Sequence, residues 1–310
     1  MHIVSVINYK GGVGKTSLTA NLAAELAYRG KKILLIDLDA QASLTFSLVS
    51  PDEWQKDYAD NKTIKSWFDS FESGKPISLT SIVESPTRIN SRLGRNSGKV
   101  DAIYSHLGLI NVDLELATSL GGATLAQAKK NFTMVHRRLA NGLGEFAANE
   151  YDLALIDCPP NFNIVTKTAI IASDFVLVPA RPDYLSTLGI EYLIRSVTAL
   201  VKDYNDFAEL GQGEKVEPIK PKLLGVVFMM IQEYGGGPMA AQRAFMGRHQ
   251  TAGLTVFDNY IKRNDTLFAD APQYGVPVVL NRYSSESHQS VVEGLEEVAT
   301  EFGRHMKWWK

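Results

Sequence analysis

Cysteine is almost absent from this chain of 310 residues, which contains Cys158 alone. A single cysteine excludes a disulfide within one chain and any metal cluster that needs several thiolates of that chain. Because Cys158 follows an apolar run, we expect it to be a buried, unreactive thiol.

Long apolar runs are missing as well. No stretch of about 18 apolar residues occurs, which is the length that a membrane span needs. The first residues, MHIVSVINYKGG, also lack the basic segment and apolar core that direct export. We therefore expect a cytoplasmic protein.

The chain has no excess of charge of one sign. Its formal net charge is −2, so no general attraction to nucleic acid or anionic lipid is expected, and any contact with DNA requires a local basic patch. Hydrophobic residues make up 45% and charged residues 21% of the chain, which excludes a collagenous or disordered protein.

Short apolar runs alternate with helical patterns along the chain. The run Ile3–Ile7 is β-branched and predicts a buried strand, and leucines at every fourth position predict a helix from Thr16 to Gly30. The other predicted elements are strands at Lys32–Asp37, Leu153–Asp157, Phe175–Pro179 and Leu223–Ile231, and a helix at Ser186–Val201. This alternation predicts a three-layer α/β fold with a doubly wound, mostly parallel sheet flanked by helices.

Residues 51–99 interrupt this alternation. The segment is polar and contains the turn sequences Ser-Gly-Lys-Pro and Arg-Asn-Ser-Gly-Lys. We expect residues 1–310 to form a single domain that carries residues 51–99 as an insertion with mobile parts, and we find no internal repeat.

A glycine-rich loop lies between the first predicted strand and helix. Its glycines allow successive N–H groups to face a phosphate, and the positive end of the following helix favours the bound anion. Lys15 would reach the β- and γ-phosphates of a nucleotide, and Thr16 would place its hydroxyl on Mg²⁺. The predicted nucleotide-binding residues are Lys10, Gly11, Gly12, Val13, Gly14, Lys15, Thr16 and Ser17. The predicted cofactors are ATP and Mg²⁺, and the alternative is a glycine-rich turn that only caps a helix.

This loop departs from the ordinary phosphate-binding motif, which has glycine where this chain has Tyr9. With Lys10 followed by paired glycines, it resembles the deviant Walker A motif of the ParA/MinD superfamily, also called the signature-lysine ATPases. The resemblance implies that Lys10 contacts the nucleotide of a second subunit, so that two chains enclose two ATP molecules.

Two acids lie at the end of the predicted strand Lys32–Asp37 and just after it. Asp37 and Asp39 occupy alternate positions and point to one face while strand geometry lasts. The segment resembles the Asp-x-Asp-Pro-Gln sequence of ParA-like proteins, with Ala40 in place of the proline. The resemblance implies that Asp39 positions the attacking water and that Asp37 lies near the metal, whereas the alternative is that both acids only cap a strand end. The predicted catalytic residues are Lys10, Lys15 and Asp39.

A third acid, Asp157, ends the strand Leu153–Asp157, as expected of a Walker B segment that holds Mg²⁺. The Cys-Pro-Pro that follows resembles the ParA form of this segment. The predicted metal-site residues are Thr16, Asp37 and Asp157.

Two later segments resemble the same superfamily, and they favour the ParA/Soj branch over MinD. Residues 177–189 resemble the strand and turn that lead to the helix packed in the family's dimer. Residues 261–264 and 271–277 resemble a loop that lies close to the adenine.

The function implied by the resemblance is that of a ParA-like ATPase. Its ATP-bound homodimer would bind DNA without sequence preference, and a ParB-like adaptor would stimulate hydrolysis to ADP and phosphate while a plasmid, a chromosome or another cargo is partitioned or positioned. Such a protein would be associated with the nucleoid of a prokaryote. The candidate DNA-binding residues form two groups: Arg88, Arg92, Arg95 and Lys99 in the insertion, and Lys129, Lys130, Arg137 and Arg138 in a predicted helix Thr124–Leu139. A solvated basic face is the alternative for each group.

Two other functions share the deviant loop. A MinD-like, membrane-cycling regulator needs a basic amphipathic tail, but the seam of Val291, Leu295, Val298 and Phe302 is narrow and glutamates surround it, so we expect this tail to dock on the domain. A metal-cluster carrier would bridge its cluster with more thiolates than two copies of Cys158 supply.

Overall fold

The computed structural model describes residues 1–209, 217–251 and 254–309. Within them, all neighbouring strands pair in parallel in one six-stranded sheet of order β3-β2-β4-β1-β5-β6. The strands are β1 His2–Val6, β2 Lys32–Asp37, β3 Lys99–Ile103, β4 Leu153–Asp157, β5 Phe175–Ala180 and β6 Lys222–Phe228. The predicted α/β class is confirmed, and five of the strands follow the predicted runs to within a few residues.

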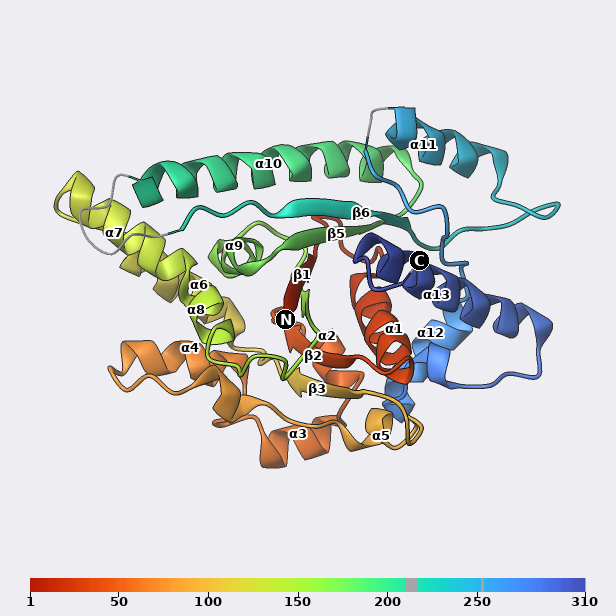
Figure 1. Cartoon of the computed structure of the whole chain (residues 1–310), viewed down its shortest axis with the longest axis horizontal. Helices are drawn as coiled ribbons and strands as arrows, with labels where there is room; N and C mark the ends of the chain where they lie inside the picture. The colour runs from red at the N-terminus through yellow and green to blue at the C-terminus, as the bar shows by residue number, and fades with distance from the viewer. Residues whose placement is uncertain (210–216, 252–253, 310) are drawn as a thin grey trace.

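The helices cover both faces of this sheet (Figure 1). The longer ones are α1 Lys15–Tyr28, α4 Ile64–Glu72, α6 Leu109–Ser119, α7 Leu125–His136, α9 Ile164–Ala172, α10 Tyr184–Glu209, α11 Ala240–Thr251, α12 Asp265–Tyr274 and α13 Glu286–His305. The shorter ones are α2 Ser43–Phe46, α3 Pro51–Asp57, α5 Thr87–Asn90, α8 Arg138–Leu143, and the 3₁₀ helices η1 Leu79–Ile82 and η2 Val278–Leu280.

Alternation of side chains along the buried strands creates two cores. In β2, Ile33 and Leu35 join the cluster that contains α1 and α13, whereas Leu34 and Ile36 join the cluster that contains α6, α9 and α10. Because both faces of a parallel sheet are covered, its strands are apolar at almost every position. The three predicted layers are therefore present.

The strand order places a switch point between β1 and β4, which are neighbours. From β1 the chain crosses through α1 to β2 on one side, and from β4 it crosses through α9 to β5 on the other. In sheets of this kind ligands bind at the carboxyl ends of the strands beside the switch point. The glycine-rich loop and Asp157 both lie at this place.

Residues 51–99 contain the helices α3, α4, η1 and α5, and their apolar side chains join both core clusters. Trp54 lies in the cluster of α1, while Trp67 and Phe68 lie in the cluster of α9, and all three are buried. The segment leads into the edge strand β3, which the sequence pattern did not predict. Asp101 of this strand is buried and accepts hydrogen bonds from Tyr151 at 2.7 Å and from Lys99 at 2.5 Å. This acid interrupts the apolar pattern by which a buried strand is predicted.

The predicted helix Thr124–Leu139 is correct at its start and divided near its end. Thr124 caps α7 by accepting a hydrogen bond from the amide of Gln127. The helix stops at His136, and Arg137 joins it to the short helix α8.

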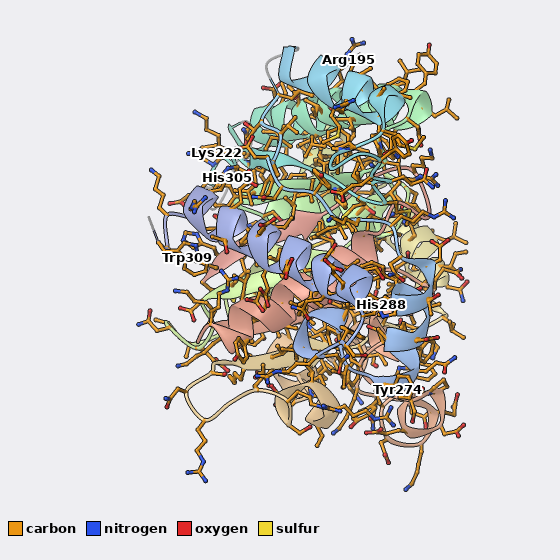
Figure 2. All side chains as sticks on the ribbon, turned by 90° about the vertical axis from the view of Figure 1, so that its right-hand side faces the viewer. Arg195, Lys222, Tyr274, His288, His305 and Trp309 are labelled. Atoms are coloured by element: carbon orange, nitrogen blue, oxygen red, sulfur yellow. The ribbon has the colours of Figure 1, made fainter. Side chains whose placement is uncertain are left out.

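The C-terminal helix α13 lies across α1 on one face of the molecule (Figure 2). The predicted seam of Val291, Leu295, Val298 and Phe302 is buried, with none of the four more than 3% exposed. Trp309 turns back, and its indole N–H donates to the carbonyl of Thr300 at 2.9 Å. The expected docking of this tail on the domain is thus confirmed.

Candidate functional site

The glycine-rich loop joins β1 to α1 in a strongly bent path. Gly12 and Gly14 adopt φ values of 65° and 93°, in the left-handed region that side chains disfavour. Asn8 fixes the start of the loop, because its amide donates to the carbonyl of Pro179 at 2.8 Å and its oxygen accepts from the backbone N–H of Lys10 at 3.0 Å. No sequence pattern had assigned Asn8 this role.

Lys15 stands at the first position of α1 with its side chain directed into the site. The residue is 7% exposed, and its ammonium donates to the carbonyl of Lys10 at 3.4 Å. Burial lowers the pKa of Lys15, against the opposing effect of the negative charges of Asp157 and Asp39. A cation held beside the bent loop in this way suits a phosphate ligand.

Thr16 and Asp157 are in direct contact. The Thr16 hydroxyl donates to Oδ2 of Asp157 at 2.6 Å, and Oδ1 of Asp157 is buried without a hydrogen-bond partner among the described residues. Burial, together with the charge of Asp37, raises the pKa of Asp157 to about 8. A buried carboxylate oxygen without a partner, next to a hydroxyl, fits the hard oxygen ligands that Mg²⁺ prefers.

Asp37 lies beside Asp157, since the two residues pair in register on β2 and β4. Its Oδ2 accepts from both the backbone N–H and the hydroxyl of Thr45 at 2.8 Å, and its Oδ1 accepts from the N–H of Asp39 at 3.1 Å. Burial raises the pKa of Asp37 to about 7, against these hydrogen bonds. Asp37 therefore anchors α2 and the loop before it, and its predicted place near the metal remains a prediction.

Asp39 lies beyond the end of β2, in the loop that leads to α2. Its Oδ1 accepts from the N–H of Gln41 at 3.0 Å, and its carbonyl accepts from the Ser105 hydroxyl at 2.7 Å. The loop passes through Ala42, which has φ 52°. The half-buried carboxylate of Asp39 lies close enough to Lys15 for its negative charge to act to raise the pKa of that lysine.

Lys10 reaches across the site to the start of α10. Its ammonium donates to both oxygens of Asp183, at 2.9 and 2.8 Å, and to the hydroxyl of Ser186 at 3.3 Å. Burial acts to raise the pKa of Asp183, but the hydrogen bonds from Lys10 and Ser186 prevail and hold it below the usual value. Neither Asp183 nor Ser186 was predicted as a site residue, because both lie far from Lys10 in the sequence.

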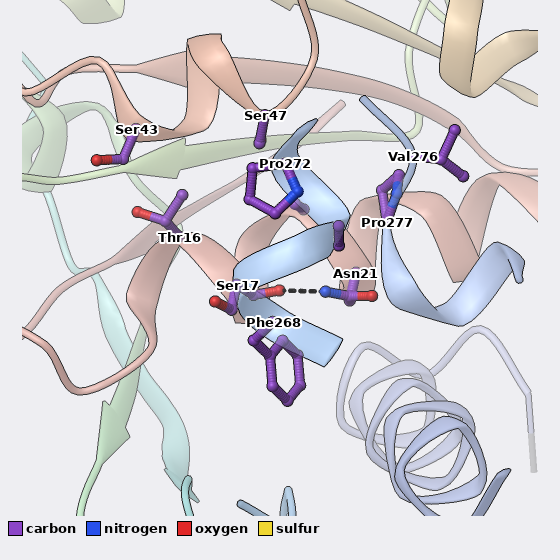
Figure 3. A pocket seen from close by; sticks show the side chains of 11 residues that line it. Thr16, Ser17, Asn21, Ser43, Ser47, Phe268, Pro272, Val276 and Pro277 are labelled. Atoms are coloured by element: carbon purple, nitrogen blue, oxygen red, sulfur yellow. Dashed lines mark hydrogen bonds between the residues drawn. The ribbon is translucent and has the colours of Figure 1, made fainter. Parts of the chain in front are cut away.

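A cavity of about 180 Å³ opens next to the start of α1 (Figure 3). Thr16 and Ser17 face residues of α12, among them Phe268 and Pro272, across this space. Asn21 joins the walls, since its amide donates to the carbonyl of Ser17 and its oxygen accepts from the N–H of Val279. The other lining residues are Ala20, Ser43, Ser47, Ala271, Val276 and Pro277.

None of the residues in the two predicted basic groups lines this cavity, although the side chain of Arg88 packs beside Gly275, the neighbour of the lining residue Val276. Arg88, Arg92 and Arg95 are exposed on and after α5, whereas Lys99 pairs with Asp101. In the second group Lys130 is exposed. The ammonium of Lys129, however, lies 5.5 Å from the centre of the Phe207 ring, and the guanidinium carbon of Arg138 lies 4.4 Å from the centre of the Phe71 ring. Burial lowers the pKa of Arg138. Arg137 bonds Asn141 at 3.2 Å.

Fold and site together define a phosphate-loop ATPase of the ParA/MinD superfamily. Residues 1–210 match the family model described as an AAA domain, AAA_31, and the chain belongs to this family.

Its relatives include Soj, the sporulation initiation inhibitor protein of Bacillus subtilis, which is 26% identical over 298 residues covering 96% of this chain and 98% of Soj. An uncharacterized protein of Methanocaldococcus jannaschii is 30% identical over 228 residues, covering 74% of this chain and 73% of that protein. Cyanothece McdA in complex with ATP has the same fold, with a TM-score of 0.70 and 19% identity over 99% of this chain and 96% of that one.

Within the described ranges, no helix has the length and apolar character needed to cross a bilayer. Cys158 is buried, as expected, and the same part of the chain holds no group of three or more residues of the types His, Cys, Asp and Glu arranged to hold a metal ion.

Proposed function

We propose that this chain is a single-domain, magnesium-dependent ATPase that dimerises around bound ATP and separates after hydrolysis. The observation that carries the proposal is the meeting of Lys10, Lys15, Thr16, Asp39 and Asp157 at the carboxyl edge of the sheet, around a loop bent to receive phosphate. Relatives named for chromosome partitioning in Caulobacter vibrioides and for cell division in Myxococcus xanthus support a partition or positioning role.

Binding of the nucleotide is assigned to residues on and around α1. The backbone of residues 10–14 and Lys15 would hold the phosphates, and the cavity between α1 and α12 would take the less polar part of the nucleotide. Mg²⁺, when bound, neutralises charge that develops on the phosphates. Thr16 and Asp157 are the residues that would hold it, and Asp37 would keep the neighbouring loop in place.

Hydrolysis to ADP and phosphate is assigned to positioning by this chain's own residues. Asp39 would orient the attacking water, while Lys15 stabilises negative charge on the transferred group. Phosphoryl transfer of this kind depends on position and charge more than on covalent help from the protein.

Dimerisation is supported by an apolar surface beside Lys10. Tyr184, Leu185, Leu188 and Tyr192 on α10 are 58%, 67%, 46% and 66% exposed, although they lie close to a polar site. Large apolar side chains gathered on a surface are typical of an interface. A second copy placed on this face would bring its nucleotide within reach of Lys10.

We further propose that the dimer binds DNA without sequence preference in the cytoplasm of a prokaryote, in association with the nucleoid. A ParB-like adaptor would stimulate its hydrolysis. Arg88, Arg92, Arg95 and Lys130 are the most exposed of the candidate contacts, and Lys129, Arg137 and Arg138 are less available because they contact neighbouring side chains.

A gel-shift titration with and without ATP tests this function. We expect wild type to shift DNA only with ATP, Lys10→Ala to fail to dimerise and bind, and Asp39→Ala to remain as a DNA-bound dimer. Added salt should weaken the shift steeply, because non-specific binding is electrostatic. Equal, nucleotide-independent behaviour of all three proteins would contradict the partition function.

A further inference from the structure

The Lys10 ammonium has a complete set of partners within its own chain. It lies 2.8 and 2.9 Å from the two oxygens of Asp183 and 3.3 Å from the hydroxyl of Ser186, and the Lys10 side chain is only 32% exposed. A two-oxygen contact of this kind is among the stronger hydrogen bonds that an ammonium makes. The amine is therefore occupied before any nucleotide approaches from outside.

The position of Asp183 is fixed by the backbone around it. Its Oδ1 accepts from the N–H of Ser186 at 2.9 Å, and its carbonyl accepts from the N–H of Thr187, so it acts as the cap at the start of α10. Ser186 is fully buried. The contact with Lys10 is consequently held by a rigid helix end.

The same helix end carries the exposed apolar side chains Tyr184, Leu185 and Leu188. Lys10 bound to Asp183 thus lies at the edge of the surface that a second copy would cover. A lysine held in this way cannot at the same time donate to a phosphate in another subunit, because the three N–H groups of its ammonium already face three oxygen acceptors in its own chain.

We propose that Asp183, with Ser186, is an autoinhibitory latch that holds Lys10 in its own chain until a nucleotide in a second copy replaces the carboxylate. The proposal rests on the proposed function, because it assumes that Lys10 acts across a dimer. In this scheme each protomer exchanges one carboxylate for one phosphate, and the exchange sets the nucleotide and protein concentrations at which dimers form.

The size of the effect follows from the partial exposure of the pair. Ion pairs at such sites contribute up to about 1 kcal/mol, which is about a fivefold change in an equilibrium constant. A symmetric dimer opens two latches, so the dissociation constant of the dimer changes by up to about 25-fold when both are removed.

Asp183→Asn tests the latch, because asparagine keeps the helix cap but loses the charge. Dimerisation is measured by sedimentation at rising protein concentration with Mg²⁺ and a non-hydrolysable ATP analogue. We expect Asp183→Asn to dimerise at several-fold to about 25-fold lower concentration than wild type. Asp203→Asn, at an exposed carboxylate on the same helix, is the matched control and should behave as wild type. An unchanged or weaker dimer of Asp183→Asn would overturn the proposal.

A second measurement needs no dimer. The rate at which Lys10 reacts with an amine-acylating reagent is followed by mass spectrometry on nucleotide-free protein at low concentration. A latched ammonium reacts slowly, and we expect acylation of Lys10 to be several-fold faster in Asp183→Asn than in wild type or Asp203→Asn. Equal rates would overturn the latch even if wild type dimerises with ATP. If no protein dimerises but the acylation rates differ as expected, the Lys10–Asp183 restraint stands and the proposed dimer function fails.

Discussion

The hydroxyl of Thr16 donates a 2.6 Å hydrogen bond to Asp157, and this contact joins the first turn of α1 to the end of β4. The second oxygen of Asp157 is buried without a partner among the described residues. The same two groups are those that we assign to Mg²⁺, so the contact is one that a bound ion would rearrange.

Replacing Thr16 with alanine should therefore affect both folding and binding. Thr16→Ala removes the hydrogen bond from a fully buried carboxyl group, and we expect a loss of about 1–3 kcal/mol in the free energy of unfolding. Thr16→Ser keeps the hydroxyl and should lie within about 1 kcal/mol of wild type. Denaturant titration measures the stability. Calorimetry measures the binding of ATP: Mg²⁺ should strengthen ATP binding by Thr16→Ser but should not strengthen ATP binding by Thr16→Ala. Mg²⁺ acting equally on both variants would refute this metal site.

Two glycines of the bent loop should differ in how far their replacement by alanine lowers the stability. Gly14 has φ 93°, and a Cβ there would lie 2.9 Å from the flexible end of Met229, so the backbone strain dominates. Gly14→Ala should lose about 1–2 kcal/mol of stability and bind ATP more weakly. Gly11 has open space around it and lies outside the left-handed region, so Gly11→Ala should fold with unchanged stability. Thermal unfolding distinguishes the two, and an equal loss for both would show that the loop has another conformation.

His136 predicts a dependence of stability on pH. Burial lowers its pKa to about 4, with a smaller contribution from the charge of Lys167 and against the hydrogen bond to the Phe132 carbonyl. Between its ordinary pKa of 6.5 and about 4, the unfolded chain binds a proton at this residue and the folded chain does not. Stability therefore rises with pH through this window, and protonation at its lower end costs at most about 3 kcal/mol.

His136→Phe retains an aromatic ring against Phe132 and cannot titrate. We expect its unfolding free energy to change less steeply than that of wild type between pH 4 and 6.5. His2→Gln, at a side chain that is 49% exposed, is the control and should keep the slope of wild type. Parallel slopes for His136→Phe and wild type would mean that this histidine is not buried in the neutral form.

The C-terminal tryptophans provide a test of the membrane alternative. Trp309 bonds Thr300, and the ammonium of Lys31 lies 4.7 Å from the centre of the Trp308 ring, so both rings are engaged with the protein. Trp309→Ala should lower stability by about 2 kcal/mol, roughly half the cost at a fully buried tryptophan. Tyr274→Ala, at a residue 68% exposed, should have little effect on stability.

A liposome experiment tests membrane binding directly. With ATP, wild type should not sediment with anionic liposomes. Sedimentation that is lost on deleting residues 307–310 would favour a MinD-like cycle.

The sequence predicted those parts of the fold whose pattern is local. β4 is apolar at every position before its acid, and α13 carries a regular seam, so both could be placed from the sequence. β3 was missed because Asp101 interrupts its apolar run, and a buried carboxyl becomes acceptable only once Tyr151 and Lys99 are folded against it. The break at Arg137 likewise has no proline or glycine to mark it.

The candidate site divides in the same way. The residues of the glycine-rich loop could be predicted from a contiguous motif. Two of its glycines, Gly12 and Gly14, adopt the positive φ that glycine tolerates best. Asn8, Ser186 and Asp183 had no such motif, since their partners are brought to them by the parallel pairing of β1 with β5. Contacts across a sheet depend on strand order, which the sequence pattern alone did not specify.

ATP is expected to join two copies of this chain through Lys10. Sedimentation of wild type and Lys10→Ala with Mg²⁺ and a non-hydrolysable ATP analogue measures it directly. We expect wild type to change from the 34.2 kDa of one chain to twice that mass, whereas Lys10→Ala should bind the nucleotide and stay at the mass of one chain. A wild-type protein that is saturated with nucleotide and remains a single chain at high concentration would contradict it.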